Sequence, residues 1–301
     1  MKIHFSNVNF SSSSGPNTFA HRLASELSLR GYKIVNHDQE YEVFLCFIEP
    51  SSFPKKGSKF IQRLDGIWFK PEEFNTHNKG IKYAYDNCDH VIWQSEFDKS
   101  MTQKWWGQRS GSVIYNGIKF NQIKKVDPGL IQLRERYDFI FVASSSWHRQ
   151  KRLKENIELF LSLKDNHPNS CLIVLGKPDH IIKHPDIFYV GHLTHQQCLE
   201  VYSISDWMLH LAWLDHCPNV VVEAISQNCK VICSNSGGTS EIVRSNGIIV
   251  EETTPYNFEL TDYDKPYNLD IPKLNLTDIE IKNDYLKIEN VADQYEKIFK
   301  I

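Results

Sequence analysis

The sequence has no apolar run close to the roughly 18 to 20 residues that a membrane-spanning helix requires. Its first ten residues also lack the apolar core of a signal peptide. The seven cysteines are scattered without a Cys-x-x-Cys pair, and an odd number of this kind is typical of reduced thiols rather than disulfides or a zinc site. We therefore expect a cytoplasmic protein and assign no chemistry to its cysteines.

A strong charge of either sign is also absent, because the formal net charge is −3 at pH 7. Nonspecific binding to nucleic acid depends on many Lys and Arg contacts to phosphates, so no nucleic-acid partner is expected. Hydrophobic residues at 41% and charged residues at 24% are typical of a globular protein. A chain of 301 residues suits two domains of about 100 to 200 residues each.

The first part of the chain alternates short apolar runs with polar or helical stretches. Strands are expected at residues 2–5, 34–35, 43–48, 59–62, 91–94 and 113–115, with a helix at 16–30. This alternation is typical of a parallel sheet built from βαβ units. The polar stretch 119–137, which contains Pro128-Gly129, predicts a linker or hinge.

The same alternation begins again after this stretch. Strands are expected at 139–143, 170–175, 187–190, 207–211 and 230–234, and helices at 154–164, 194–204 and 219–227. Residues 255–276 have no clear period and predict an irregular connection, whereas 284–301 regains helical spacing. We predict an N-terminal domain over 1–121 and a C-terminal domain over 122–283. The terminal helix 284–301 is expected to cross back to the first domain.

The segment 214–224 combines two acids, Asp215 and Glu223, with a predicted helix start at Pro218 or Asn219. Free N–H groups at such a helix start lie at the positive end of its dipole and can bind a diphosphate. Asp215 precedes the helix and Glu223 lies about one turn inside it, so the two can address different parts of one ligand. The candidate binding residues here are His216, Cys217, Pro218, Asn219, Val220 and Glu223.

Together with the downstream Gly-Gly-Thr-x-Glu at 237–241, this segment resembles the Glu-x7-Glu region of retaining glycosyltransferases of the GT-B fold, especially family 4. Asp215 stands in the place of the first Glu. The resemblance implies that Asp215 is a catalytic group that contacts the transferred sugar and that Glu223 binds the ribose hydroxyls. The alternative is that Asp215 is only an anion near the N-terminus of the helix and that Glu223 is a solvated residue of the helix.

Residues 144–154 resemble the loop of this family in which an Arg and a Lys hold the donor diphosphate. Lys151 matches the Lys, whereas Ser144 replaces the Arg and Arg149 is the candidate for supplying that charge from another direction. Cations aimed at a departing diphosphate stabilise the transition state more than the ground state. The alternative is a solvated loop followed by a helix.

In the first domain, Gly15 lies in a turn between a strand and a helix, where this family commonly has Gly-Gly and where this sequence continues with Pro16. A glycine at such a junction allows close approach of a ligand. Asp65, in Arg63-Leu64-Asp65-Gly66, stands where the family often places a His or Asp that faces the acceptor. Either residue can alternatively serve only the turn.

The resemblance implies an α/β protein of the GT-B fold, with two Rossmann-like β/α/β domains facing each other across a cleft. It also implies transfer of a sugar, with retention, from a UDP- or GDP-sugar co-substrate to an acceptor hydroxyl in glycan or glycoconjugate biosynthesis. The acceptor can be a glycan, a lipid-linked saccharide or a small molecule. The alternatives are a binding-only relative, suggested by Ser144 and Asp215, and a 2-epimerase or phosphorylase on the same fold.

Two further patterns concern a metal and a membrane. Asp262-Tyr263-Asp264 has the Asp-x-Asp spacing of metal-dependent glycosyltransferases but lies in the irregular connection, so no metal or other cofactor is expected. A group of basic and aromatic residues could make weak peripheral contact with the inner face of an anionic membrane, although a helix end with packed tryptophans is the alternative. This group comprises Lys99, Lys104, Trp105, Trp106 and Arg109.

Overall fold

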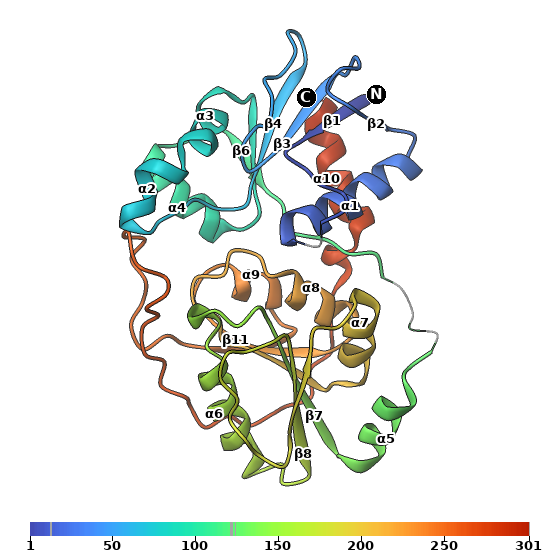
Figure 1. The fold of residues 1–301 in the computed structure, drawn as a ribbon, viewed down its shortest axis with the longest axis vertical. Coiled ribbons are helices and arrows are strands. Elements are labelled where there is room, and N and C mark those ends of the chain that lie inside the picture. Colours follow the sequence, from blue (N-terminus) through green and yellow to red (C-terminus); the bar gives the residue numbers. More distant parts are fainter. Residues whose placement is uncertain (13, 121–122, 124, 301) are drawn as a thin grey trace.

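The structure, a computed structural model, describes residues 1–12, 14–120, 123 and 125–300. It contains two six-stranded parallel sheets with interspersed helices, one sheet in each part of the chain (Figure 1). The predicted α/β architecture of two Rossmann-like domains is therefore confirmed. The boundary predicted between residues 121 and 122 lies outside the described residues.

The first sheet has the strand order β2-β1-β3-β4-β5-β6, and every neighbouring pair is parallel. Its strands are β1 (Lys2–Ser6), β2 (Lys33–Val35), β3 (Val43–Phe47), β4 (Lys59–Leu64), β5 (His90–Trp93) and β6 (Gly111–Val113). Its helices are α1 (Gly15–Leu29), α2 (Pro71–His77), α3 (Lys79–Asn87) and α4 (Glu96–Trp106). Apolar residues of α1 pack on one face of the sheet, and those of α3 and α4 pack on the other.

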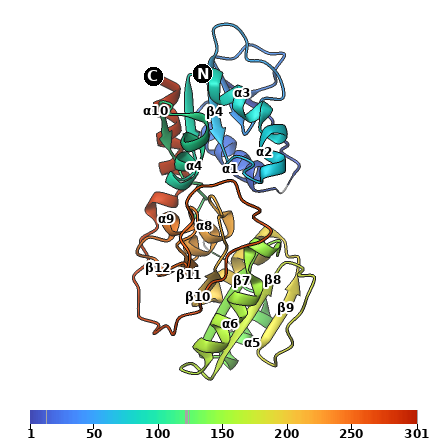
Figure 2. The same cartoon turned by 90° about the vertical axis from the view of Figure 1, so that its left-hand side faces the viewer.

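The second sheet has the order β12-β11-β10-β7-β8-β9, which is the strand order of dinucleotide-binding Rossmann domains. Its strands are β7 (Phe139–Ser144), β8 (Ser170–Leu175), β9 (Ile187–Gly191), β10 (Trp207–His210), β11 (Lys230–Ser234) and β12 (Gly247–Val250). Its helices are α5 (Pro128–Arg136), α6 (Leu153–Lys164), α7 (His195–Ile204), α8 (Asn219–Ser226) and α9 (Thr239–Val243). Figure 2 shows α8 and α9 at the end of this sheet that faces the first domain.

Several elements were not predicted from the sequence, among them the helices α2, α3, α4 and α9, and two more in the second half of the chain differ from a specific expectation. The stretch predicted as a linker contains α5, because Pro128 suits the first turn of a helix and the Asp127 carboxylate accepts a hydrogen bond from the Gly129 N–H at 2.7 Å. Strand β12 was not predicted either, and it pairs with β11 at the edge of the second sheet. Both elements belong to the second half of the chain, and its strand order remains that of a Rossmann domain.

The chain returns to the first domain at its C-terminal end. Residues 251–283, all of them described, form no helix or strand, as predicted for 255–276. After a short 3-10 turn at Asp284–Leu286, helix α10 (Ile288–Lys300) lies beside α1, where the rings of Phe19 and Tyr295 are 6.1 Å apart (Figure 1). In the described part of the chain, no helix has the length and apolar character needed to cross a bilayer.

Candidate active site

Lys151 and Asp215, two charged candidates of the second domain, lie in contact at the point of the sheet where the connections switch from one face to the other. Strands β7 and β10 are neighbours, and their following loops leave the carboxyl edge of the sheet on opposite sides, which is the position of the ligand-binding crevice in open α/β sheets. Lys151 lies in the loop after β7 and Asp215 in the loop after β10. Lys151 Nζ is 2.5 Å from Asp215 Oδ2, although the residues are 64 positions apart.

Asp215 is held as a charged carboxylate. Burial alone would raise its pKa, but the charge of Lys151 and the hydrogen bond from His210 outweigh burial and hold the pKa well below its usual value. His210 Nε2 lies 3.3 Å from the same oxygen atom, Asp215 Oδ2. The crevice therefore contains a positive and a negative charge that are already fixed relative to each other.

Helix α8 begins beside this pair, with Pro218 as its N-cap and Asn219 as its first residue. The Asn219 side chain donates to the Gly15 carbonyl at 3.1 Å and accepts from the Asn116 side chain at 3.1 Å. Val220 is partly exposed at the next position. The predicted helix start therefore faces the predicted Gly15 turn of the first domain.

The side chains of His216 and Cys217 point toward the first domain. The His216 ring lies against Gly66, at its closest point 2.6 Å from where a Gly66 Cβ would stand, and its centroid is 5.3 Å from that of Phe97. Cys217 Sγ accepts from the Asn116 N–H at 3.4 Å. Burial lowers the pKa of His216 to about 4 and raises that of Cys217 to about 12, so both are neutral at pH 7.

Glu223 is buried and already paired. Arg22 Nη2 of α1 lies 2.5 Å from Glu223 Oε1, and His195 Nε2 at the start of α7 lies 3.4 Å from the same oxygen. Burial would raise the Glu223 pKa, but the hydrogen bond from His195 and the charge of Arg22 lower it overall. Sequence reasoning missed both partners, since Arg22 is 201 positions away and no local motif marks it.

In the loop after β7, Lys151 forms the ion pair with Asp215, whereas the other two candidates of this loop do not. Arg149 is exposed in a 3-10 turn, and the buried Ser144 hydroxyl accepts from the Tyr202 hydroxyl at 2.9 Å. The buried Arg152, which was not singled out, donates to both carboxylate oxygens of Glu252 at 2.6 and 2.9 Å. Arg152 thus anchors the loop next to Lys151.

Asp65 follows β4 at the carboxyl edge of the first sheet, and its carboxylate forms an ion pair with Arg63. Arg63 is buried, and its guanidinium carbon lies 4.4 Å from the centroid of the Phe19 ring. The Asp65 carbonyl accepts from the Gln94 side chain at 2.7 Å. Asp65 is therefore close to the cleft but held by its own domain, and it is not in contact with the Lys151–Asp215 pair.

The Asp-x-Asp segment pairs with lysines. Lys70 Nζ lies 3.6 Å from Asp262 and 3.3 Å from Asp264, and Lys265 lies 2.9 Å from Asp262. Across the described ranges, no three His, Cys, Asp or Glu side chains form a group that could hold a metal ion.

The basic and aromatic group near α4 makes contacts within the chain. Lys104 Nζ lies 2.7 Å from Glu259, and the Trp105 indole N–H donates to the Phe258 carbonyl at 3.0 Å. Arg109 donates to the Cys88 carbonyl. These contacts fit the packed helix end, and contact of this surface with a membrane stays a prediction.

Two Rossmann-like domains, with a charged pair at the carboxyl edge of the second sheet and a helix start directed at the first domain, define the GT-B class of protein. Residues 131–259 match the family model described as Glycosyl transferases group 1. A search of curated proteins finds no match to this chain.

Solved structures share the fold over nearly their whole length. Sucrose-phosphate synthase from Thermosynechococcus elongatus has a TM-score of 0.69 and 12% identity, with 100% of this chain and 98% of that chain covered. Anabaena Alr3699/HepE in complex with UDP and glucose has a TM-score of 0.65 and 15% identity, with 100% and 99% covered. WaaG, a glycosyltransferase involved in lipopolysaccharide biosynthesis, has a TM-score of 0.59 and 11% identity, with 100% and 91% covered.

Proposed function

We propose that the protein is a retaining, metal-independent glycosyltransferase that moves a sugar from a nucleoside diphosphate sugar to an acceptor hydroxyl. The observation that carries this proposal is the Lys151–Asp215 pair, 2.5 Å apart in the crevice of the second sheet and next to the start of α8. A diphosphate placed between Lys151 and the free N–H groups of α8 would be bound from two sides. The donor domain would then be residues 122–283 and the acceptor-side domain 1–121 with helix 284–301.

Each residue has a distinct role in this proposal. Lys151 stabilises the negative charge that grows on the departing diphosphate, with Arg149 as a second cation that moves in from the surface. Asp215 holds Lys151 before the donor arrives and then accepts from hydroxyls of the transferred sugar. Glu223 accepts from the ribose hydroxyls. Asp65 lies on the acceptor side. The bond between the anomeric carbon and the diphosphate oxygen breaks, the acceptor oxygen bonds to that carbon on the same face, and the acceptor proton passes to the departing diphosphate.

UDP is the first nucleotide to test, because similar structures are complexes with UDP and glucose and with UDP-glucose. The other base proposed is guanine. The acceptor is proposed to be a glycan, a lipid-linked saccharide or a small molecule in cytoplasmic glycan biosynthesis. Resemblance to family 4 supports retention.

A thermal-shift panel of UDP-, GDP-, ADP- and TDP-sugars tests donor binding. A ligand at 100 times its dissociation constant stabilises the folded state by about 2.7 kcal/mol, so one base should raise the melting temperature clearly above the others. Absence of a shift with every nucleotide would contradict the proposal.

Donor turnover after extensive EDTA treatment tests the absence of a metal requirement, and we expect turnover to persist. Loss of turnover that Mg²⁺ or Mn²⁺ restores would contradict metal independence. Nucleotide binding without turnover on any acceptor would favour the binding-only alternative.

A further inference from the structure

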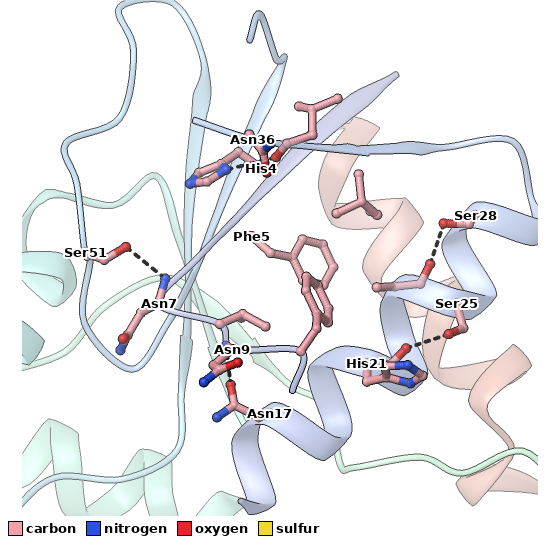
Figure 3. Close-up of a pocket in the computed structure, with 15 residues that line it drawn as sticks. His4, Phe5, Asn7, Asn9, Asn17, His21, Ser25, Ser28, Asn36 and Ser51 are labelled. Atoms are coloured by element: carbon pink, nitrogen blue, oxygen red, sulfur yellow. Dashed lines mark hydrogen bonds between the residues drawn. The ribbon is translucent and has the colours of Figure 1, made fainter. Parts of the chain in front are cut away.

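A cavity of about 930 Å³ lies in the first domain, between α1 and the carboxyl ends of β1 and β2 (Figure 3). This volume is at the upper end of the range of about 300 to 1,000 Å³ that is usual for small-molecule sites. None of the sequence-predicted site residues lines it. In Figure 3, Asn7, Asn9 and Asn17 gather where β1 leads into α1, and Ser25 and Ser28 project from α1.

The cavity lies where the topology of the first sheet favours a ligand. Strand β1 lies between β2 and β3, so the loops after β1 and β3 leave its carboxyl edge toward different faces. The loop after β1 contributes residues 7–10 to the lining, and the loop after β3 contributes Ser51. Ser51 also donates to or accepts from Ser6 at the end of β1, at 3.1 Å. The cavity therefore includes residues from both loops at this switch point of the first sheet and extends from there along α1 toward β2.

The lining is polar but carries no permanent charge. Four asparagines, three serines and two histidines contribute to it, and among the described lining residues there is no Lys, Arg, Asp or Glu. Burial and the neighbouring His37 lower the pKa of His4, despite a hydrogen bond with the Val35 carbonyl, so His4 is mainly neutral at pH 7. The rings of Phe5 and Phe10 add an apolar surface, with centroids 6.3 Å apart.

The nearest charges of α1 are engaged elsewhere. Arg22 pairs with Glu223 of the second domain at 2.5 Å, and Glu26 pairs with Arg30 at 2.7 Å. A phosphate or carboxylate in the cavity would thus lose water without gaining a cation, which is costly. Hydroxyl groups both donate and accept, as do the amides and hydroxyls of the lining.

Hydrogen bonds lead from one end of the cavity to the start of α8. Asn17 accepts from the Asn9 N–H at 2.8 Å and donates to the Ser14 hydroxyl at 2.8 Å. The next residue after Ser14 is Gly15, whose carbonyl accepts from Asn219 at the start of α8 at 3.1 Å. A ligand at the Asn17 end would lie close to this contact between the domains.

On these grounds we infer that the cavity binds the acceptor, and that this acceptor is an uncharged saccharide rather than a sugar phosphate, a uronic acid or an anionic lipid headgroup. This inference rests on the proposed function, because it names the acceptor class of the same reaction. Aromatic rings and neutral hydrogen-bonding groups would then select the acceptor, while the charges of the second domain serve the donor.

The first test compares acceptors in matched pairs. Nucleotide release from the donor is measured with uncharged mono- and disaccharides, each against its 6-phosphate and its uronate. We expect release to be at least about tenfold faster with the uncharged member, because the charged one has no counterion in the cavity. Preference for charged members would overturn the inference.

Variants of the lining test the location. His21→Ala and Phe10→Ala should raise the acceptor KM on the order of tenfold and leave the dissociation constant for UDP within about twofold, since each removes one contact to the saccharide. Phe53→Ala is the matched control, because Phe53 is 71% exposed and outside the lining. An acceptor KM unchanged by both lining variants would overturn the location.

Ser28→Lys places a cation on the cavity face of α1 and should increase turnover with the phosphorylated acceptors, whereas unchanged selectivity would count against the inference.

Saturation-transfer NMR with the uncharged saccharides measures their binding independently of sugar transfer. If His21→Ala and Phe10→Ala abolish saccharide binding, the cavity assignment is supported even if no nucleotide binds, and only the proposed function would then be contradicted. If no saccharide binds but donor turnover is normal, the cavity is not the acceptor site, and the proposed function is unaffected.

Discussion

Lys151 is the residue on which the proposed chemistry depends most. Loss of one well-placed electrostatic donor in an active site commonly lowers kcat on the order of 10²- to 10³-fold, and we expect Lys151→Ala to fall in or beyond this range. The measurement is donor turnover at saturating donor. The variant leaves the partly buried Asp215 without its main cation, so folding must be verified by circular dichroism.

Lys154 provides the matched control for Lys151. It lies one turn further along, is 74% exposed, and pairs with Glu158 of the same helix at 3.4 Å. Lys154→Ala should therefore keep nearly full turnover. If Lys151→Ala is folded and also keeps near-wild-type turnover, the loop does not bind the diphosphate, and the binding-only alternative gains support.

His216 predicts a specific pH dependence of stability. Its pKa is lowered by burial to about 4 in the folded protein and is about 6.5 in an unfolded chain, so the unfolded state binds more protons between these values. The contribution of His216 to the free energy of unfolding should thus fall as the pH decreases from 6.5 to 4. The acids Asp215 and Glu223, whose pKa values are also lowered in the folded state, add their own loss only below their unfolded values of about 4.

Chemical denaturation of wild type and His216→Asn across this pH range measures the contribution. The variant should show a shallower decrease between pH 6.5 and 4, and His192→Asn, which changes an exposed histidine, should leave the decrease unchanged. Equal slopes for wild type and His216→Asn would show that protonation of His216 is not linked to unfolding.

At the scale of single elements, the loop after β7 is held by Arg152. This residue adopts a left-handed backbone conformation, with φ of 50°, and donates to Glu252 and to the Tyr267 carbonyl. Removal of one partner of a buried ion pair typically destabilises a protein by about 3 to 5 kcal/mol, so Arg152→Ala should lower the free energy of unfolding in this range. Arg152→Lys should recover only part of it, because a lysine cannot donate to both Glu252 oxygens in parallel.

Denaturant unfolding measures both Arg152 variants. Arg152→Lys separates the contribution of the charge to the free energy of unfolding from that of the paired hydrogen bonds, since lysine keeps the charge but cannot donate to both Glu252 oxygens in parallel. A free energy of unfolding for Arg152→Ala within about 0.5 kcal/mol of wild type, as is usual for surface substitutions, would show that the anchor contributes little.

The sequence predicted the regular elements best where an apolar run has clear ends. Strands β8 and β11 have the predicted bounds, and α7 and α8 differ from them by a single residue at one end. Helix α5 was missed because Pro128-Gly129 is also typical of a turn, although proline is favourable in the first helical turn. Strand β12 was missed although Ile248, Ile249 and Val250 are β-branched residues that favour a strand.

The candidate site was predictable only to the extent that local motifs mark it. Lys151 and Asp215 lie in two loops with recognisable patterns, and a parallel sheet brings such loops to one edge. Arg22 and His195 have no such pattern. Their contact with Glu223 depends on how one domain packs on the other, which hydrophobic periodicity within an element does not determine.

At the scale of the whole molecule, contacts from several elements hold the two domains together. Besides the contacts of α8 with α1, the Glu241 carboxylate of α9 accepts from the N–H groups of Glu96 and Phe97 at 2.7 and 2.8 Å. These N–H groups form the start of α4, where a negative charge is favourable. The irregular connection also reaches the first domain, since the Thr261 N–H donates to the Phe69 carbonyl at 2.9 Å. The described structure is thus an arrangement in which the domains already touch around the crevice.

In this arrangement, Arg22 and the proposed ribose hydroxyls require the same carboxylate, that of Glu223. Arg22→Ala should therefore raise the affinity for UDP on the order of tenfold, because a hydrogen bond to a charged group no longer has to be given up. It should also lower the melting temperature, since a buried carboxylate loses its main cation. Glu223→Gln should weaken UDP binding, and adding Arg22→Ala to it should have little further effect, because both changes act on one pair.

Isothermal titration calorimetry of UDP with the four members of this cycle measures the coupling between the domains. Arg30→Ala is the control, since Arg30 follows the same helix but pairs with Glu26, Asp293 and Glu296 within the first domain and its α10 partner. It should lower stability without changing the affinity for UDP. If Arg22→Ala instead weakens UDP binding while Arg30→Ala does not, Arg22 binds the nucleotide together with Glu223, and closure of the first domain completes the donor site rather than competing with it.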